Sequence, residues 1–276
     1  MNIATVLVLS ILAGGLGALT GLGGGSILIP VLAALGVPIQ YAIAASMVAI
    51  IATSSASAAS YVRHRLSNVR AAFYLEMFTI TGAIVGATIT TLIEPRLLYF
   101  FFAAFLTTSF FGIHRHSGDS PADANMVQDR AARWLGLEGS YYDEALGREV
   151  PYKMTRPLLG GAGMFIAGLA AGMLGIGAGA FKVSVHEVVL RMPSKVSSAT
   201  SNFIIGMTAL AGASVYFASG YLYLSLAAPI ALGSSIGAAV GGRLLNRMHH
   251  RTLRFLFLAI LVYLIVQMVY TGLRAP

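Results

Sequence analysis

The sequence predicts an all-α polytopic membrane protein, built from two inverted repeats that each contain three membrane-spanning helices and a glycine-broken helix pair. Composition is the first of three observations behind this prediction. Of the 276 residues, 57% are hydrophobic and only 10% are charged, and the mean hydropathy is +0.79. Soluble domains usually carry about 25% charged residues. The other two observations are a glycine motif that occurs twice and a distribution of basic loops that reverses between the halves.

Apolar segments fall into two sets of five, and several exceed the roughly 18 residues that mark a candidate membrane span. The first set covers 3–22, 26–36, 41–62, 71–93 and 97–113, and the second covers 157–176, 179–190, 196–219, 222–242 and 253–272. The two sets agree in order and length. The sequence therefore predicts a first membrane repeat (1–113), an insertion (114–156) and a second membrane repeat (157–276).

The internal repeat is visible in the glycine motif. The stretch Gly21–Gly25 (GLGGG) aligns with Gly175–Gly179 (GIGAG) at an offset of 154 residues, and the offset becomes 155 after one inserted residue. The pairs at that offset are Ser46 with Ser201, Thr53 with Thr208, Tyr61 with Tyr216, Gly82 with Gly237, Gly86 with Gly241 and Phe100 with Phe255. A nearly constant offset over this length indicates two homologous halves.

The basic residues indicate how the two halves are related. The loop after segment 41–62 carries Arg63, Arg65 and Arg70, whereas the equivalent loop of the second half, ASGYLYLS, has no charge. The next loop reverses this pattern, because LIEPRLL has a single arginine beside a glutamate and its counterpart carries Arg243, Arg247, Arg251 and Arg254. Under the positive-inside rule, equivalent loops therefore lie on opposite faces of the membrane, and the repeats are inverted.

Inversion requires an odd number of crossings in each half, so the glycine-broken pair must return to the side from which it starts. It then forms a re-entrant hairpin or a span folded back by a short second helix. The segment 26–36 is shorter than the about 20 residues that a straight span needs, and this favours the hairpin.

The polar stretch from His114 to Arg156 is predicted to lie in the cytoplasm. Its sequence ANMVQDRAARWLGL is compatible with a short amphipathic helix. The sequence SYYDEALGREVPYK has alternating aromatics on both sides of a turn around Gly147, which is typical of a small β-hairpin. The charges of the stretch roughly cancel, so we interpret it as a structural linker or lid rather than a binding domain.

Enzymatic and nucleic-acid functions find little support in the sequence. The formal net charge is +8, but the basic residues lie mainly in short loops beside apolar segments, where membrane proteins place them to fix orientation. The chain has no cysteine and no His/Asp/Glu cluster at metal-ligand spacing, and GLGGGS lacks the strand, the amphipathic helix and the Lys-Ser/Thr of nucleotide-binding loops. We therefore expect no enzyme activity, no cofactor, no metal and no nucleic-acid partner.

The two glycine motifs form the predicted substrate site. In transporters with inverted repeats, broken helices meet near the bilayer midplane, and the amides at a half-helix N-terminus carry partial positive charge. Glycine lets a substrate approach that backbone closely, so such a site suits an anion. The alternative is that these glycines only allow close helix packing. The predicted backbone of the site comes from Gly23, Gly24, Gly25, Ser26, Gly177, Ala178 and Gly179.

Small polar side chains on the helix after each motif complete the predicted site. Hydroxyl and amide groups can donate hydrogen bonds to an anion, although many bond to their own helix instead. The selected residues are Ser46, Thr200, Ser201 and Asn202. We also expect Lys182, three residues after Gly179, to add a full charge to the site.

The second glycine-broken segment carries further ionisable residues. His186 and Glu187 could relay a proton, because an ionisable group at membrane depth is by default a functional hypothesis. The other interpretation is that Glu187 and Arg191, four residues apart, only neutralise each other near the cytoplasmic surface.

Both copies of the motif resemble the sulfite exporter TauE/SafE family. The first copy reads GLTGLGGGSILIPVL followed by AIAASMVAIIATSSASAASYV, and the second reads GMLGIGAGAFKVS followed by MPSKVSSATSNFIIGMTALAG. The resemblance covers essentially the whole chain outside the insertion. It implies ATP-independent transport of sulfur-containing anions, such as sulfite, sulfonate, sulfoacetate or thiosulfate, usually outward. The second copy departs from the family pattern at Ala178, where a glycine is usual, and at Ser184, where a proline is common.

These observations together predict a secondary transporter of small anions that exports by alternating access in the inner (plasma) membrane. The alternative is an anion channel of the same fold, in which the hairpins form a filter rather than a gate. The predicted partners are the anionic substrate and the lipid bilayer. The sequence leaves open the particular anion, coupling to protons or to the membrane potential, and assembly as a homo-oligomer.

Overall fold

The computed structural model describes residues 3–20, 24–63, 67–115, 128–143, 147–245, 262–263 and 265–274. The first half contains α1 (Ile3–Thr20), α2 (Gly24–Ala34), α3 (Ile39–Arg63), α4 (Val69–Leu92) and α5 (Pro95–Arg115). The insertion contains α6 (Arg130–Trp134), β1 (Glu138–Asp143) and β2 (Arg148–Lys153). The second half contains α7 (Pro157–Leu174), α8 (Gly179–Ser184), the π-helix η1 (Val185–Val189), α9 (Ser194–Ala218) and α10 (Leu224–Leu245). Residues 262–263 and 265–274 are also helical.

The described chain is mostly helical, as predicted, and several helices are apolar enough to cross a membrane. Val69–Leu92, Pro157–Leu174 and Ser194–Ala218 are long and apolar enough to span by themselves. Shorter apolar stretches occur in α1, α2, α3, α5 and α10. At 1.5 Å per residue, the 24 residues of α4 extend about 36 Å, which exceeds the hydrocarbon thickness of about 30 Å.

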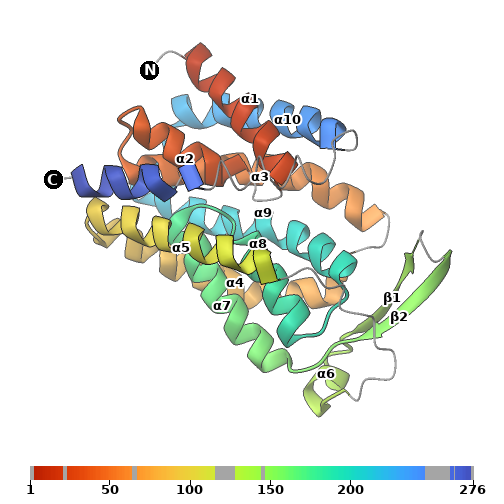
Figure 1. Ribbon diagram of the computed structural model, residues 1–276. Helices are drawn as coiled ribbons and strands as arrows, with labels where there is room; N and C mark the ends of the chain where they lie inside the picture. Colours follow the sequence, from red (N-terminus) through yellow and green to blue (C-terminus); the bar gives the residue numbers. More distant parts are fainter. Residues whose placement is uncertain are drawn as a thin grey trace.

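The helices pack in pairs around a central crossing of α3 and α9 (Figure 1). On one side α1 lies along α10, and on the other side α4 lies along α7. Glycines allow the close approach in both pairs: Gly82 of α4 lies against the carbonyl of Phe165, and Gly237 of α10 lies against the carbonyl of Ile11. A side chain at either glycine would collide with the backbone of the neighbouring helix.

Helix α7 and the α8–η1 segment form an antiparallel hairpin. Gly160 lies against the side chain of Leu190, and the Thr155 amide donates to the Leu190 carbonyl at 3.2 Å. The two ends of the hairpin therefore lie together. The turn needs left-handed backbone, with φ of 64° at Gly175 and 69° at Gly177.

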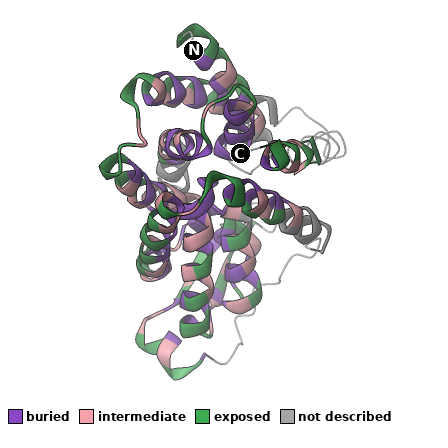
Figure 2. Ribbon diagram, turned by 90° about the vertical axis from the view of Figure 1, so that its left-hand side faces the viewer, coloured by how far each residue is buried: buried purple, intermediate pink, exposed green. Residues whose placement is uncertain are grey.

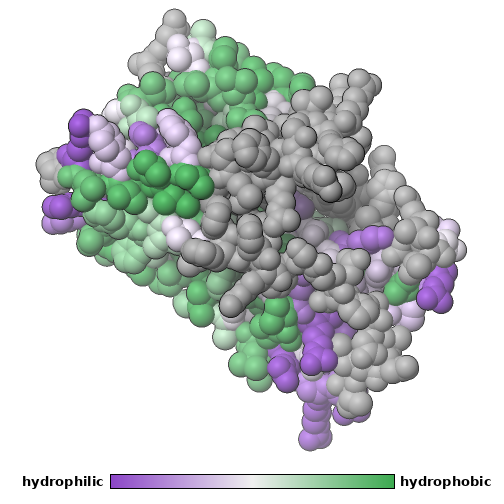
Figure 3. Space-filling view, viewed as in Figure 1, coloured by the Kyte–Doolittle hydropathy of each residue, from purple (hydrophilic) through white to green (hydrophobic). Residues whose placement is uncertain are grey.

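Burial follows the packing of the helices. Buried residues gather on the inner sides of the helices and exposed residues face outward (Figure 2). Large apolar side chains point outward from helices all around the body, for example Phe73, Leu210 and Val240. Apolar residues cover much of the described surface in Figure 3, whereas polar residues gather over the insertion at the lower right. An apolar exterior of this extent is what a lipid-facing surface requires.

The insertion forms the predicted hairpin, with β1 antiparallel to β2 and Tyr141 opposite Val150. Its apolar face packs on Ala71 at the start of α4 and on Met192 and Val196 around the start of α9. The predicted short helix is present as the five residues of α6. The insertion therefore covers the end of the bundle at which the α7–η1 hairpin begins and ends (Figure 1).

Candidate functional site

The two glycine motifs lie next to each other although they are far apart in the sequence. A Cβ atom placed on Gly25, at the start of α2, would lie 3.0 Å from the carbonyl oxygen of Gly175 and 2.8 Å from Cδ1 of Ile50. The start of α2 thus touches the turn between α7 and α8. Only a residue without a side chain fits at Gly25 while this contact is kept.

Ser46 connects helix α3 to the second glycine turn. Its hydroxyl lies 2.8 Å from the Gly175 carbonyl oxygen and 2.7 Å from the Ile43 carbonyl oxygen. A hydroxyl has one proton, so it donates to one of these carbonyls at a time. Ser46, which is fully buried, therefore holds the turn of the other half in place.

Ser201 has a related place in the second half. Its hydroxyl donates to the carbonyl of Gly179 at 3.4 Å. A Cβ atom on Gly179 would lie 2.9 Å from Cδ1 of Ile205, and one on Gly177 would lie 3.2 Å from Cγ2 of the same isoleucine. Ile50 of α3 therefore lies against Gly25 and Gly177, and Ile205 of α9 lies against Gly177 and Gly179.

Ala178 has a left-handed backbone conformation, with φ of 49° and ψ of 33°, at the N-cap of α8. For a residue with a Cβ atom this conformation costs about 1–2 kcal/mol. Ala178, where a glycine is usual in the family pattern, is therefore strained at a position where glycine would be unstrained.

The other predicted site residues are buried or contact their own or a neighbouring segment. Gly24 lies against Gly14 of α1, and Ser26 is buried. Thr200 accepts a hydrogen bond from the Asn68 amide at 3.1 Å, and Asn202 donates to the carbonyl of its own helix at Ser198, at 3.0 Å. Gly23 lies outside the described residues.

Lys182 belongs to a buried polar network that connects three helices. Its side chain is fully buried, and Nζ donates to the Thr208 hydroxyl of α9 at 2.7 Å. The Thr208 oxygen lies 2.9 and 3.1 Å from the two carboxylate oxygens of Glu76 on α4. Glu76 also accepts a hydrogen bond of 2.6 Å from Thr79. One threonine hydroxyl therefore bridges an ammonium and a carboxylate inside the bundle.

Glu76 is a residue that the sequence reasoning missed. It is the only acidic residue of segment 71–93, and only 2% of its side chain is exposed. An ionisable group inside an apolar span is expensive unless it is paired, so this position alone is a signal of function. Its partner could not be found in the same way, because Thr208 is separated from Glu76 by 132 residues.

His186 and Glu187 lie in the π-helix η1 and are both buried. Nδ1 of His186 lies 3.4 Å from the Ser197 carbonyl oxygen, and its Nε2 has no hydrogen-bond partner among the described residues. π-helical turns are often found at functional positions.

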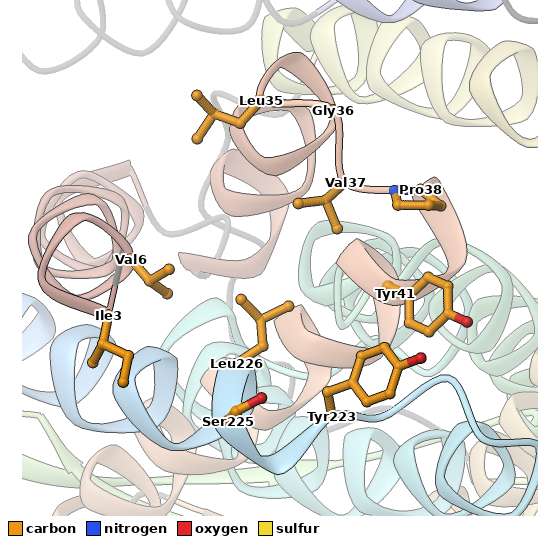
Figure 4. A pocket seen from close by; sticks show the side chains of 10 residues that line it. All are labelled: Ile3, Val6, Leu35, Gly36, Val37, Pro38, Tyr41, Tyr223, Ser225 and Leu226. Atoms are coloured by element: carbon orange, nitrogen blue, oxygen red, sulfur yellow. The ribbon is translucent and has the colours of Figure 1, made fainter. Parts of the chain in front are cut away.

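A cavity of about 700 Å³ lies at a different place, where the first glycine-broken pair begins and ends. Ile3 and Val6 of α1 face the turn from Leu35 to Pro38 after α2, and the ring of Tyr41 stacks on that of Tyr223 at 5.0 Å (Figure 4). The lining is mostly apolar and aromatic. The start of α1 and the end of α2 therefore meet around one cavity.

Together, the apolar helices, the paired helix breaks and the buried charges define a multi-pass membrane protein of the transporter class. The model of the sulfite exporter TauE/SafE family matches residues 6–268, and the chain belongs to that family. It is a transporter family, not an enzyme family. Among curated proteins, the chain is similar to the probable membrane transporter protein YunE of Bacillus subtilis (strain 168), with 25% identity over 281 residues and 99% of each chain covered. No solved structure matches the chain.

Proposed function

We propose that this protein is a secondary transporter that exports small sulfur-containing anions, such as sulfite, sulfonate, sulfoacetate or thiosulfate, across the plasma membrane. The observation that carries the proposal is the contact between the two glycine motifs. A Cβ atom placed on Gly25 of the first half would lie 3.0 Å from the Gly175 carbonyl oxygen of the second half. Backbone donors at such breaks form substrate sites in transporters with inverted repeats. Membership in the family supports the choice of anion.

Equivalent contacts on the two sides of the bundle support a two-fold relation of the halves. Gly168 of α7 lies against the carbonyl of Thr79 on α4, and Gly14 of α1 lies against the carbonyl of Ser234 on α10. Gly14 and Gly168 differ by the repeat offset of 154, and Thr79 and Ser234 differ by the offset of 155. A two-fold exchange of the halves generates this correspondence.

In the proposed cycle, the anion binds between the two glycine motifs. Backbone amides of Gly23, Gly24, Gly25 and Ser26 act from one half, and those of Gly177, Ala178 and Gly179 act from the other. The hydroxyls of Ser46 and Ser201, which now donate to glycine carbonyls, turn to the anion, and Thr200 and Asn202 support the polar helix face behind them. Lys182 supplies the full positive charge. In this orientation, residues 114–156 lie on the cytoplasmic side.

The test is flux through the purified protein in liposomes. Liposomes are loaded with sulfite, thiosulfate, sulfoacetate, sulfate or chloride, and the exchange of a labelled external anion is measured. We expect saturable exchange of at least one sulfur anion, lost in Lys182→Ala and retained in Gly36→Asn, which replaces a glycine in an open turn with φ of 82°. Large currents without exchange would indicate a channel of the same fold. If none of the five anions crosses, the proposal is wrong.

A further inference from the structure

We propose that Glu76 is the coupling residue of this transporter and binds one proton for each singly charged anion carried. The inference rests on the proposed anion transport and adds its energy source. Glu76 acts through Lys182 rather than by touching the anion. The proton releases Lys182 from its carboxylate partner, and the freed ammonium pairs with the anion.

The geometry places one polar path between the two charges. Lys182 Nζ donates to Thr208 at 2.7 Å, and Thr208 reaches the carboxylate of Glu76 at 2.9 Å. A hydroxyl that accepts from the ammonium keeps one proton to donate to the carboxylate. When Glu76 takes a proton from water, its new O–H can donate to Thr208, and the hydroxyl is no longer needed as a donor. Thr208 therefore fits both protonation states of Glu76.

Among the residues that the structure describes, few other charges lie on the helices packed around Glu76. Helix α7, which packs along α4, has no charged residue between Pro157 and Leu174. Helix α9 carries Lys195 in its first turn, and the α8–η1 segment carries Lys182, His186 and Glu187. Helix α4 itself has Arg70 near its start, and α3 ends at Arg63. Of these groups, Lys182 is the one joined to Glu76 through a shared hydroxyl.

Charge balance explains why the proton and the anion travel together. The ionised Glu76–Lys182 pair is neutral, and both side chains are at least 98% buried, with exposed fractions of 2% and 0%. A singly charged anion added to this pair would leave one uncompensated negative charge in a medium of low dielectric constant. One proton on Glu76 removes that charge, because the protonated carboxyl, the ammonium and the anion sum to zero. Transport of a singly charged anion is then electroneutral, and the proton leaves with the anion on the other side.

The test separates coupling from transport. Liposomes containing the protein and an internal pH dye receive an external acid step in the presence of a monosulfonate or of hydrogen sulfite, both singly charged, with the membrane potential clamped by potassium and valinomycin. For the anion that exchanges, we expect wild-type protein to accumulate it and to acidify the interior, with less than a two-fold effect of the clamped potential for a singly charged species. Exchange without internal acidification in wild-type protein overturns the inference.

Substitutions test whether Glu76 is the residue that binds the coupled proton. Glu76→Gln is expected to lose at least ten-fold of the accumulation driven by the pH gradient while still exchanging labelled anion for unlabelled anion at equal pH. Glu94→Gln, which changes an exposed carboxyl just beyond the end of α4, is the control and keeps both activities. Accumulation by Glu76→Gln at the wild-type level, or its loss in Glu94→Gln alone, contradicts the assignment. Absence of exchange in wild-type protein would instead refute the anion transport itself.

Discussion

The two halves of the molecule differ in charge at positions that the repeat predicted from the sequence makes equivalent. Lys182 corresponds to Leu28, Glu76 to Ala231 and His186 to Leu32, whereas Thr208 corresponds to another threonine, Thr53. Leu28 and Leu32 are as completely buried as Lys182. The hydrogen-bonded pair of Lys182 and Glu76 therefore joins the two halves, whereas the equivalent positions, Leu28 and Ala231, are apolar. Because the equivalent positions are apolar, we infer that the charges of Lys182 and Glu76 have a role other than folding.

The largest effect is expected from breaking the charge network on one side only. Lys182→Leu leaves the carboxylate of Glu76 buried without its cation, and we expect a loss of about 3–5 kcal/mol in the free energy of unfolding. The double variant Lys182→Leu/Glu76→Ala, which gives each position the residue type of its repeat equivalent, Leu28 or Ala231, should recover most of that loss. Unfolding in detergent measures both. Leu28→Met is the matched control in the first half and should change stability by less than about 1.5 kcal/mol. A single variant as stable as wild type would contradict this view of the network.

The two glycine motifs differ in how much room they leave for a side chain. A methyl group at Gly25 would press on the backbone oxygen of Gly175, which cannot move away, whereas one at Gly179 meets only the end of the flexible Ile205 side chain. We expect Gly25→Ala to destabilise by about 1–3 kcal/mol and to reduce anion exchange at least ten-fold. Gly179→Ala should be milder on both measures. Equal effects would show that the contact between the breaks is not what limits substitution at Gly25.

A smaller effect is expected from the paired serines. Ser46 makes a hydrogen bond of 2.8 Å across the two halves, and Ser201 makes one of 3.4 Å within its own half. Ser46→Ala should cost about 1 kcal/mol of stability, and Ser201→Ala should cost less. Thermal unfolding of the two variants side by side gives the order. The reverse order would mean that the link from Ser46 to the Gly175 turn contributes little.

The smallest effect concerns the strained alanine of the second motif. Ala178→Gly removes the strain of a left-handed residue, worth about 1–2 kcal/mol, but adds backbone freedom to the unfolded chain, worth about 0.4–1 kcal/mol. We expect a net gain of roughly 0.8 kcal/mol, the difference of the midpoints of these two terms. The unfolding midpoint in denaturant is the readout. A loss of stability would show that the turn around Ala178 depends on the methyl group.

Much of the fold follows from hydropathy and from the residues that end helices and form turns. The predicted segments 41–62 and 71–93 appear as α3 (Ile39–Arg63) and α4 (Val69–Leu92), because apolar runs end at basic or turn-forming residues that close a helix. The hairpin around Gly147 was predicted from alternating aromatics and a turn glycine, and it is confirmed. These features depend on short-range sequence, so the sequence alone was sufficient.

The site was harder to predict because its contacts join distant segments. The sequence pointed to Lys182 through its charge, but not to its bond with Thr208 on α9. The contact of Gly25 with Gly175 depends on how the two halves pack, which no local pattern encodes. Glu76 could have been selected as a lone acidic residue in an apolar span, whereas its role as partner of Lys182 requires the three-dimensional arrangement.

The most direct test of the account is a structure determined with bound thiosulfate, or with whichever sulfur anion exchanges best in liposomes. The account predicts that the anion lies between the two helix breaks, within hydrogen-bond distance of Ser46 or Ser201 and of the backbone amides around Gly25 and Gly179. An anion found instead in the cavity between Tyr41 and Leu35, with the glycine breaks unchanged in contact, would contradict it. The glycine motifs would then serve helix packing alone.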